Sequence, residues 1–169
     1  MKSIFESAKQ LTPELISIRR TLHQYPEIGS ILPRTQSFVF SKLEEYGYCP
    51  QKICESAVIA TISGKQPGKT ILLRADMDAL PIKEAAPVPF ASENGYMHAC
   101  GHDGHTAIGL TTARILMELK DKLHGTLKII FQPAEEGVRG AKCICESGFL
   151  DDVDYIFAAH IMPRVKDYD

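Results

Sequence analysis

The sequence has no surplus of positive charge. Its 169 residues include 19 Lys and Arg against 21 Asp and Glu, which gives a formal net charge of -2. Proteins that bind nucleic acid or anionic lipid usually present a basic surface. The charge balance therefore argues against both kinds of partner.

Long apolar runs are absent as well. No stretch is long enough to span a bilayer, and Glu6 interrupts the segment where a signal peptide needs an unbroken apolar core. We therefore expect a cytoplasmic protein that does not associate with membranes.

The cysteines lack the regular framework of a disulfide-stapled secreted domain. There are five, an odd number, which favours a reducing compartment. Four of them are interpreted as small buried hydrophobic residues, namely Cys49, Cys54, Cys143 and Cys145.

No internal repeat, low-complexity segment or linker divides the chain. Its length and its 44% hydrophobic content suit one globular domain with a sizeable core. The G-x-S-x-G nucleophile motif is also missing, which argues against a serine hydrolase.

Helix signals occur at four places. Thr12 and Pro13 predict the capped start of a first helix that is closed off by Pro26, and His23 near its end is interpreted as a partner of the helix dipole. The other helices are expected at about residues 34–46, 105–119 and 138–147.

Four runs read as strands. Residues 57–62 and 70–75 are separated by a turn-forming segment and are expected to form a hairpin. Residues 126–131 and 154–159 alternate with helices, which is typical of an α/β fold. We predict a mixed, mostly parallel sheet flanked by helices.

Three of these strands end in residues that bind metals. Asp76 and Asp78 follow one strand, Glu135 and Glu136 lie beyond another, and His160 directly follows the last. Ligands bind outside the carboxyl ends of the strands in open α/β sheets, so these groups are expected to converge.

The densest cluster lies in residues 98–105, which contain Cys100, His102 and His105. Thiolate, imidazole and carboxylate together suit zinc, or manganese, cobalt or nickel, better than magnesium or calcium. Beside this cluster, His160 is better explained as a ligand than as a core histidine.

Glu135 and Glu136 are adjacent, and neighbouring side chains on an extended segment point apart. One carboxylate can then bind metal while the other takes a proton from an activated water. This pair predicts metal-dependent hydrolysis.

Five segments resemble the motif set of amidohydrolases of the hippurate hydrolase and auxin-conjugate hydrolase type, which are aminoacylase-like metallopeptidases. They are residues 19–27, 74–81, 98–107, 131–137 and 159–160, in the family's order. The resemblance implies the N-terminal part of a zinc-peptidase-like catalytic domain.

The resemblance also implies roles for single residues. Cys100, His102, Glu136 and His160 match the ligands of a centre with two divalent metal ions, Cys100 as the bridge, and Glu135 matches the general base. The supporting positions that line the centre are Asp76, Asp78 and His105.

Relatives of this type continue through a lid or dimerisation domain and return to the catalytic domain with one more ligating histidine. No histidine follows His160 here. Residues 1–169 are therefore expected to form a partial metallohydrolase catalytic domain without the lid. A second departure lies at Ile31, Leu32 and Pro33, where relatives usually carry acidic residues.

The leading hypothesis is hydrolysis of the amide bond of N-acyl amino acids such as hippurate or N-acetyl amino acids. Two alternatives stay open: a catalytically inactive fragment, and a dipeptidase that shares the metal site. The expected partners are a small N-acyl amino acid and either a second copy of the chain or a complementing C-terminal half, with no nucleic acid and no membrane.

Overall fold

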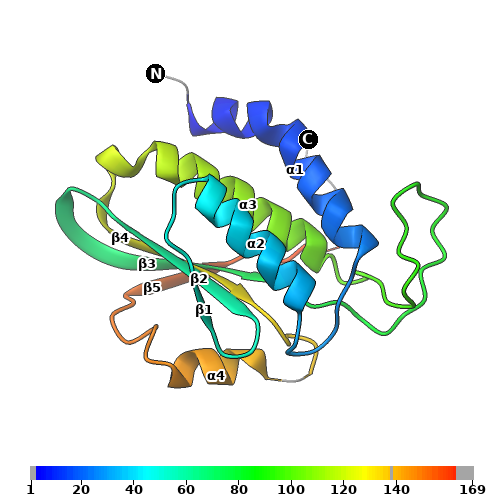
Figure 1. Cartoon of the computed structure of the whole chain (residues 1–169). Helices are drawn as coiled ribbons and strands as arrows, with labels where there is room; N and C mark the ends of the chain where they lie inside the picture. The colour runs from blue at the N-terminus through cyan, green and yellow to red at the C-terminus, as the bar shows by residue number, and fades with distance from the viewer. Residues whose placement is uncertain (1–2, 138, 163–169) are drawn as a thin grey trace.

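The computed structural model describes residues 3–137 and 139–162. Within them, ten elements follow one another along the chain (Figure 1): α1 (Ile4–Gln24), α2 (Pro33–Glu45), β1 (Gln51–Ile53), β2 (Ala57–Ser63), β3 (Gln66–Asp76), α3 (His102–Glu118), the short 3-10 helix η1 (Lys120–Lys122), β4 (His124–Gln132), α4 (Gly140–Glu146) and β5 (Tyr155–Ala158).

The five strands form one sheet in the order β1-β2-β4-β3-β5. β4 pairs parallel with β3 and antiparallel with β2. β3 also pairs parallel with β5, and β1 pairs antiparallel with β2. The mixed α/β fold is confirmed, although parallel and antiparallel pairings are equally frequent among the described strands.

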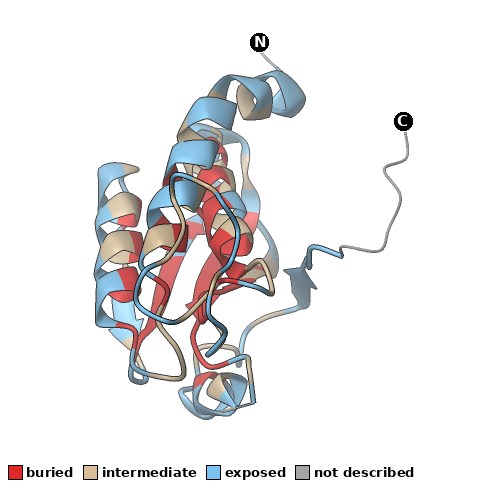
Figure 2. Ribbon diagram, turned by 90° about the vertical axis from the view of Figure 1, so that its right-hand side faces the viewer, coloured by how far each residue is buried: buried red, intermediate tan, exposed pale blue. Residues whose placement is uncertain are grey.

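Helices cover both faces of this sheet. α1, α2 and α3 lie on one face and α4 lies on the other (Figure 1). The larger core cluster packs between the sheet and the three helices and includes Val39, Leu110 and Phe131. Ile144 of α4 packs on the opposite face against Ile130. Figure 2 shows the buried residues gathered between these layers.

The predicted hairpin of β2 and β3 is wrong, because β4 lies between the two strands. Glycines in the predicted turn and in β4 itself allow β4 to enter. A Cβ atom on Gly64 would lie 1.9 Å from the Leu123 carbonyl oxygen. On the other side, a Cβ on Gly125 would lie 2.2 Å from the Lys69 carbonyl oxygen. The apolar run of β4 thus takes the central position, where it can be buried on both faces.

α1 begins eight residues before the predicted cap at Thr12. Ser3 is the N-cap, its hydroxyl accepts the Glu6 N–H, and the Glu6 carboxylate accepts the Ser3 N–H at 2.8 Å. This reciprocal capping box satisfies two otherwise unpaired donors. Pro13 is accommodated inside the helix rather than in its first turn.

The interpretation of the four cysteines as buried hydrophobic residues is wrong. Cys49 and Cys145 are exposed free thiols, and Cys54 and Cys143 form a disulfide. Both disulfide cysteines are exposed as well. The local sequence does not indicate this disulfide, because the two cysteines are 89 positions apart.

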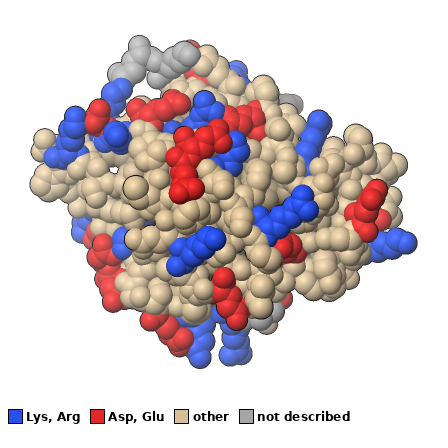
Figure 3. All heavy atoms as spheres, viewed as in Figure 1, with Lys and Arg blue, Asp and Glu red and all other residues tan. Residues whose placement is uncertain are grey.

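Charged side chains of both signs are interspersed over the face shown in Figure 3, without a continuous basic area. None of the helices in the described part of the chain combines the length and the apolar character that a membrane span requires.

Candidate metal centre

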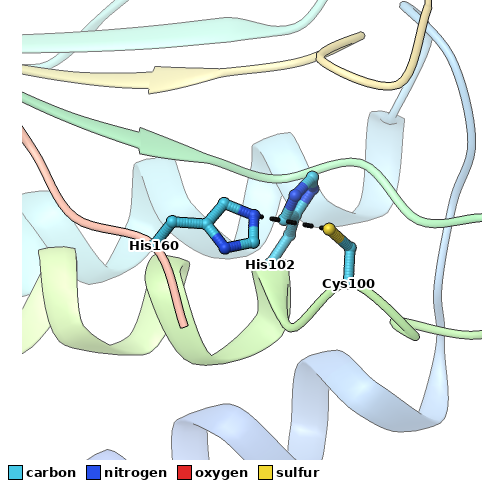
Figure 4. A group of neighbouring side chains, drawn as sticks. All are labelled: Cys100, His102 and His160. Carbon is cyan, nitrogen blue, oxygen red and sulfur yellow. Dashed lines mark hydrogen bonds between the residues drawn. The ribbon is translucent and has the colours of Figure 1, made fainter. Parts of the chain in front are cut away.

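The fold brings the predicted metal-binding residues to one end of the sheet. Cys100 lies in the loop before α3, His102 is the first residue of α3, and His160 follows β5 by two residues. One ligand atom from each of these three side chains lies within 4.8 Å of the other two, and Figure 4 shows them facing one another. Two further groups of possible ligands also contain His102, one with Glu135 and Glu136 and one with Asp76 and His105.

His102 and His160 are held in the same tautomer. Nδ1 of His102 lies 2.8 Å from the carbonyl oxygen of Asp78, and Nδ1 of His160 lies 2.7 Å from that of Ile161. A carbonyl oxygen only accepts hydrogen bonds, so each Nδ1 carries the proton and each Nε2 offers a lone pair. The backbone thereby prepares both rings to bind a cation through Nε2.

Two buried atoms at this point have no hydrogen-bond partner, Nε2 of His102 and Oε1 of Glu136. They lie 3.9 Å apart, too far for a hydrogen bond. The His160 Nε2 atom lies 3.4 Å from the Cys100 sulfur. Ligands bound about 2.0–2.3 Å from one zinc ion have separations of this order. Buried polar atoms are rarely left unpaired, so the residues present fit a divalent cation.

Asp78 fixes the backbone of the loop that carries Glu135 and Glu136. The two Asp78 carboxylate oxygens accept the backbone N–H groups of Glu135 and Glu136, each at 3.0 Å. Burial alone would raise the pKa of Asp78, but the neighbouring His102 imidazole and the hydrogen bonds from these two N–H groups lower it. The ionised Asp78 carboxylate is thus occupied in holding the loop.

Asp76 and His105 form a second support. His105 Nδ1 donates to Asp76 Oδ1 at 2.6 Å, and His105 Nε2 accepts the Ile161 N–H at 2.9 Å. The other Asp76 oxygen accepts a hydrogen bond from Arg74. Both His105 nitrogens are therefore engaged by the protein, and this chain of bonds ties the end of β3 to the segment that carries His160.

The expectation that Glu135 and Glu136 point apart is wrong. Both carboxylates approach His102 Nε2, Glu135 at 3.8 Å and Glu136 at 3.9 Å. The segment is not extended, because Ala134 has a φ of 57° and Gly137 a φ of 87°. Glu135 is the more accessible of the two, with 39% of its side chain exposed against 25% for Glu136.

The surrounding charges favour a cation. Burial would lower the pKa of His102, but the Asp78 and Asp76 carboxylates outweigh it and raise that pKa. Burial, together with the neighbouring Glu136 and Glu135 carboxylates, raises the pKa of the Cys100 thiol to about 11. Such a concentration of negative charge is stabilised by a bound cation.

Sequence reasoning missed a buried network beside the centre. His23 Nδ1 lies 2.7 Å from Asp103, and His23 Nε2 lies 2.9 Å from Glu84. Arg19 donates to the same Asp103 oxygen at 2.8 Å. His23 is thus a partner of two carboxylates rather than of the helix dipole alone. Arg19 and His23 are four positions apart on α1, so their side chains lie on the same face of the helix. This spacing is the one sequence feature that indicates a shared partner.

Comparison with known proteins now identifies the family. Residues 72–169 match the model of peptidase family M20/M25/M40. The chain belongs to this family. It is 38% identical to an indole-3-acetyl-aspartic acid hydrolase of Enterobacter agglomerans over 95% of this chain and 48% of the relative. It is 41% identical to an N-acyl-L-amino acid amidohydrolase of Geobacillus stearothermophilus over 92% of this chain and 44% of the relative.

A solved member of the family has the same fold. The dinuclear metal-binding peptidase of the M20 family from Bacillus subtilis superposes with a TM-score of 0.88 at 42% identity, covering 92% of this chain and 44% of that one. The chain therefore spans less than half the length of these relatives.

Proposed function

We propose that this chain forms the metal-binding part of an amidohydrolase that cleaves the amide bond of N-acyl amino acids. The observation that carries the proposal is the pair of histidines, His102 and His160, whose Nε2 lone pairs are freed by backbone carbonyls and aimed at Cys100 and Glu136. One relative is an indole-3-acetyl-aspartic acid hydrolase, and another is an N-acyl-L-amino acid amidohydrolase. These two names supply the substrate class.

The ligands in this proposal are Cys100, His102, Glu136 and His160. The family includes a dinuclear peptidase, which supports two divalent ions here, with Cys100 as the bridge. Zinc, manganese, cobalt or nickel would suit a set of thiolate, imidazole and carboxylate ligands. Asp76, Asp78 and His105 hold the ligands through the hydrogen bonds described above.

Divalent cations in this position would acidify a water molecule and polarise the amide carbonyl. Glu135 is the general base in this proposal. Its carboxylate is the more accessible of the adjacent pair, and it takes the proton of the attacking water and then returns a proton to the leaving amine. Asp78 fixes the Glu135 backbone, so that the carboxylate stays close to His102 Nε2.

The proposed substrate class is tested by comparing the rates at which different substrates are hydrolysed. The chain, combined with the C-terminal half of a close relative, is loaded with zinc, manganese, cobalt or nickel and offered N-acetyl amino acids, hippurate, indole-3-acetyl-aspartate and dipeptides. Faster hydrolysis of the N-acyl amino acids supports the proposal. Preference for dipeptides would favour the dipeptidase alternative, and absence of metal from every preparation would refute the centre itself.

The β5 edge of the sheet is exposed. β5 pairs with β3 on one side, and its four residues are exposed. Tyr155, Ile156 and Phe157 each expose more than half of their surface. Beside them a groove of about 350 Å³ runs between β5 and α3. An exposed apolar edge strand favours pairing with another chain.

We therefore propose that a complementing C-terminal half or a second copy covers this edge. The chain alone is then expected to show little or no amidase activity and to self-associate. Gel filtration with and without the complementing half would show whether solubility and activity rise together. A monomeric, fully active chain would contradict this proposal.

A further inference from the structure

An exposed disulfide lies on the side of the sheet opposite α1, α2 and α3. It joins Cys54, in the turn between β1 and β2, to Cys143 of α4, and the two Cα atoms are 6.2 Å apart. Both cysteines line an open groove of about 350 Å³, together with Pro133 and Arg139. A small molecule can therefore reach the sulfur atoms from solvent.

This disulfide holds the helix that directly follows the loop with the proposed ligand Glu136 and the proposed base Glu135, here called the metal-binding loop. α4 begins at Gly140, only four residues after Glu136. The Gly140 N–H donates to the carbonyl oxygen of Ala134 at 3.1 Å, which closes the loop between them. A Cβ atom on Gly140 would lie 1.9 Å from the Pro133 carbonyl oxygen. A shift of α4 must therefore move the segment that carries Glu135 and Glu136.

α4 has few other anchors. It is a seven-residue helix, and Ile144 is its one buried residue. A helix of that length is not stable by itself in water. The disulfide to Cys54 therefore contributes a large share of what keeps α4 in place.

The backbone of this region is held in unfavourable conformations. Among the described residues, the non-glycine residues with positive φ are Cys54, Ala134 and Arg139. One belongs to the disulfide and the other two bracket the metal-binding loop. Such conformations persist only where the surrounding structure fixes them, and they are concentrated at functional and switching segments. Loss of the disulfide would allow this loop to relax.

We propose that Cys54 and Cys143 form a thiol-exchange site through which low-molecular-weight thiols control the metal-binding loop. A small thiolate attacks one sulfur, the S–S bond breaks, and the other cysteine leaves as a thiolate that takes up a proton. A second small thiol then attacks the mixed disulfide. The products are two protein thiols and one small-molecule disulfide. Exposed disulfides are the readily reduced and regulatory ones.

The chemical step is tested by counting thiols. The air-oxidised chain should react with Ellman's reagent at the three free cysteines, Cys49, Cys100 and Cys145. Treatment with reduced glutathione, followed by desalting, should raise the count to the five cysteines of the sequence. Five reactive thiols in the air-oxidised chain, or no increase with glutathione, would overturn the proposal.

The coupling is tested by cobalt binding and by proteolysis. Reduction should weaken cobalt binding about tenfold, which corresponds to about 1.4 kcal/mol. Trypsin should also cut faster after Arg139 and Lys142, which are exposed beside the disulfide. The double variant Cys54→Ser/Cys143→Ser should match the reduced chain in both measurements under either redox condition. The control Cys145→Ser, on the same helix, should respond as the unmodified chain does.

The cobalt measurement rests on the proposed metal centre, whereas thiol counting and proteolysis do not. Equal cobalt affinity and equal cleavage in the two redox states would refute the coupling and leave the metal centre intact. Absence of cobalt binding in both states would refute the metal centre, and faster cleavage after reduction would still support the coupling of the disulfide to the loop.

Discussion

The imidazole of His23 lies 2.7 Å from the carboxylate of Asp103, and this contact joins the last turn of α1 to the first turn of α3. The other ring nitrogen faces Glu84. Carboxylates only accept hydrogen bonds, so both nitrogens carry protons and His23 is an imidazolium. The α3 turn that holds His102 is thereby attached to α1 by a buried ion pair.

We predict that His23→Ala destabilises the chain by about 3–5 kcal/mol, because it leaves buried carboxylates without their counter-charge. Urea unfolding measures the change. His124→Ala is the matched control, since His124 is exposed and its loss should cost less than about 0.5 kcal/mol. Similar effects of the two substitutions would contradict the importance of the network.

The same pair predicts a dependence of stability on pH. The Asp103 hydrogen bond, followed by that of Glu84, raises the pKa of His23 above its ordinary 6.5 against the effect of burial. The stabilisation is therefore complete below pH 6.5 and is lost as the pH rises through the folded pKa. Burial would raise the pKa of Asp103, but His23, His98 and Arg19 lower it below 3.8, so its contribution is lost only as the pH falls through that lower value.

Urea unfolding of the unmodified chain and of His23→Gln between about pH 6 and about pH 9 tests this sign. The stability difference between them should shrink as the pH rises. A difference that stays constant or grows would show that His23 is not charged in the folded state.

Glu135→Gln should reduce turnover by about 10²–10⁴-fold in the complemented enzyme, because the amide keeps the shape of the side chain and loses the base. Metal content should stay unchanged. Glu93→Gln, at an exposed loop position, is the control and should keep full activity. Normal turnover by Glu135→Gln would exclude Glu135 as the base.

Cys100→Ser should lower metal affinity, since the thiolate is the softest of the proposed ligands. Titration with cobalt also reports the loss of the sulfur-to-metal absorption band. Cys49→Ser removes an exposed free thiol and should leave affinity and spectrum unchanged. Unaltered stoichiometry and affinity in Cys100→Ser would make Cys100 an ordinary loop residue.

Asp78→Asn should weaken metal binding about 10–100-fold although Asp78 is not a proposed ligand. The Glu135 and Glu136 N–H groups bond different oxygens of Asp78, and in asparagine an NH2 donor replaces one of these oxygens, so one N–H group loses its acceptor. Cobalt titration gives the affinity, and urea unfolding gives the accompanying loss of stability, about 1–3 kcal/mol for one unsatisfied buried group. Unchanged affinity would show that the loop needs no support from Asp78.

The sequence by itself determined the α/β class, the position of most helices and strands, and the grouping of Asp76, Glu136 and His160 at one end of the sheet. These follow from local periodicity and from the rule that the carboxyl ends of parallel strands meet at one edge. Only the tertiary structure decided which strands are neighbours, because the pattern of β2 and β3 is the same whether or not β4 lies between them.

Contacts between residues far apart in the sequence could not be predicted from the local sequence pattern either. Eighty residues separate His23 from Asp103, and 89 separate Cys54 from Cys143. Their contacts depend on how α1 packs on α3 and on how α4 packs beneath the sheet. The bends at Ala134 and Gly137 likewise turned Glu135 and Glu136 toward one histidine, whereas an extended segment would have separated them. Periodicity reports which face of an element is apolar, but packing of distant elements decides which polar groups meet.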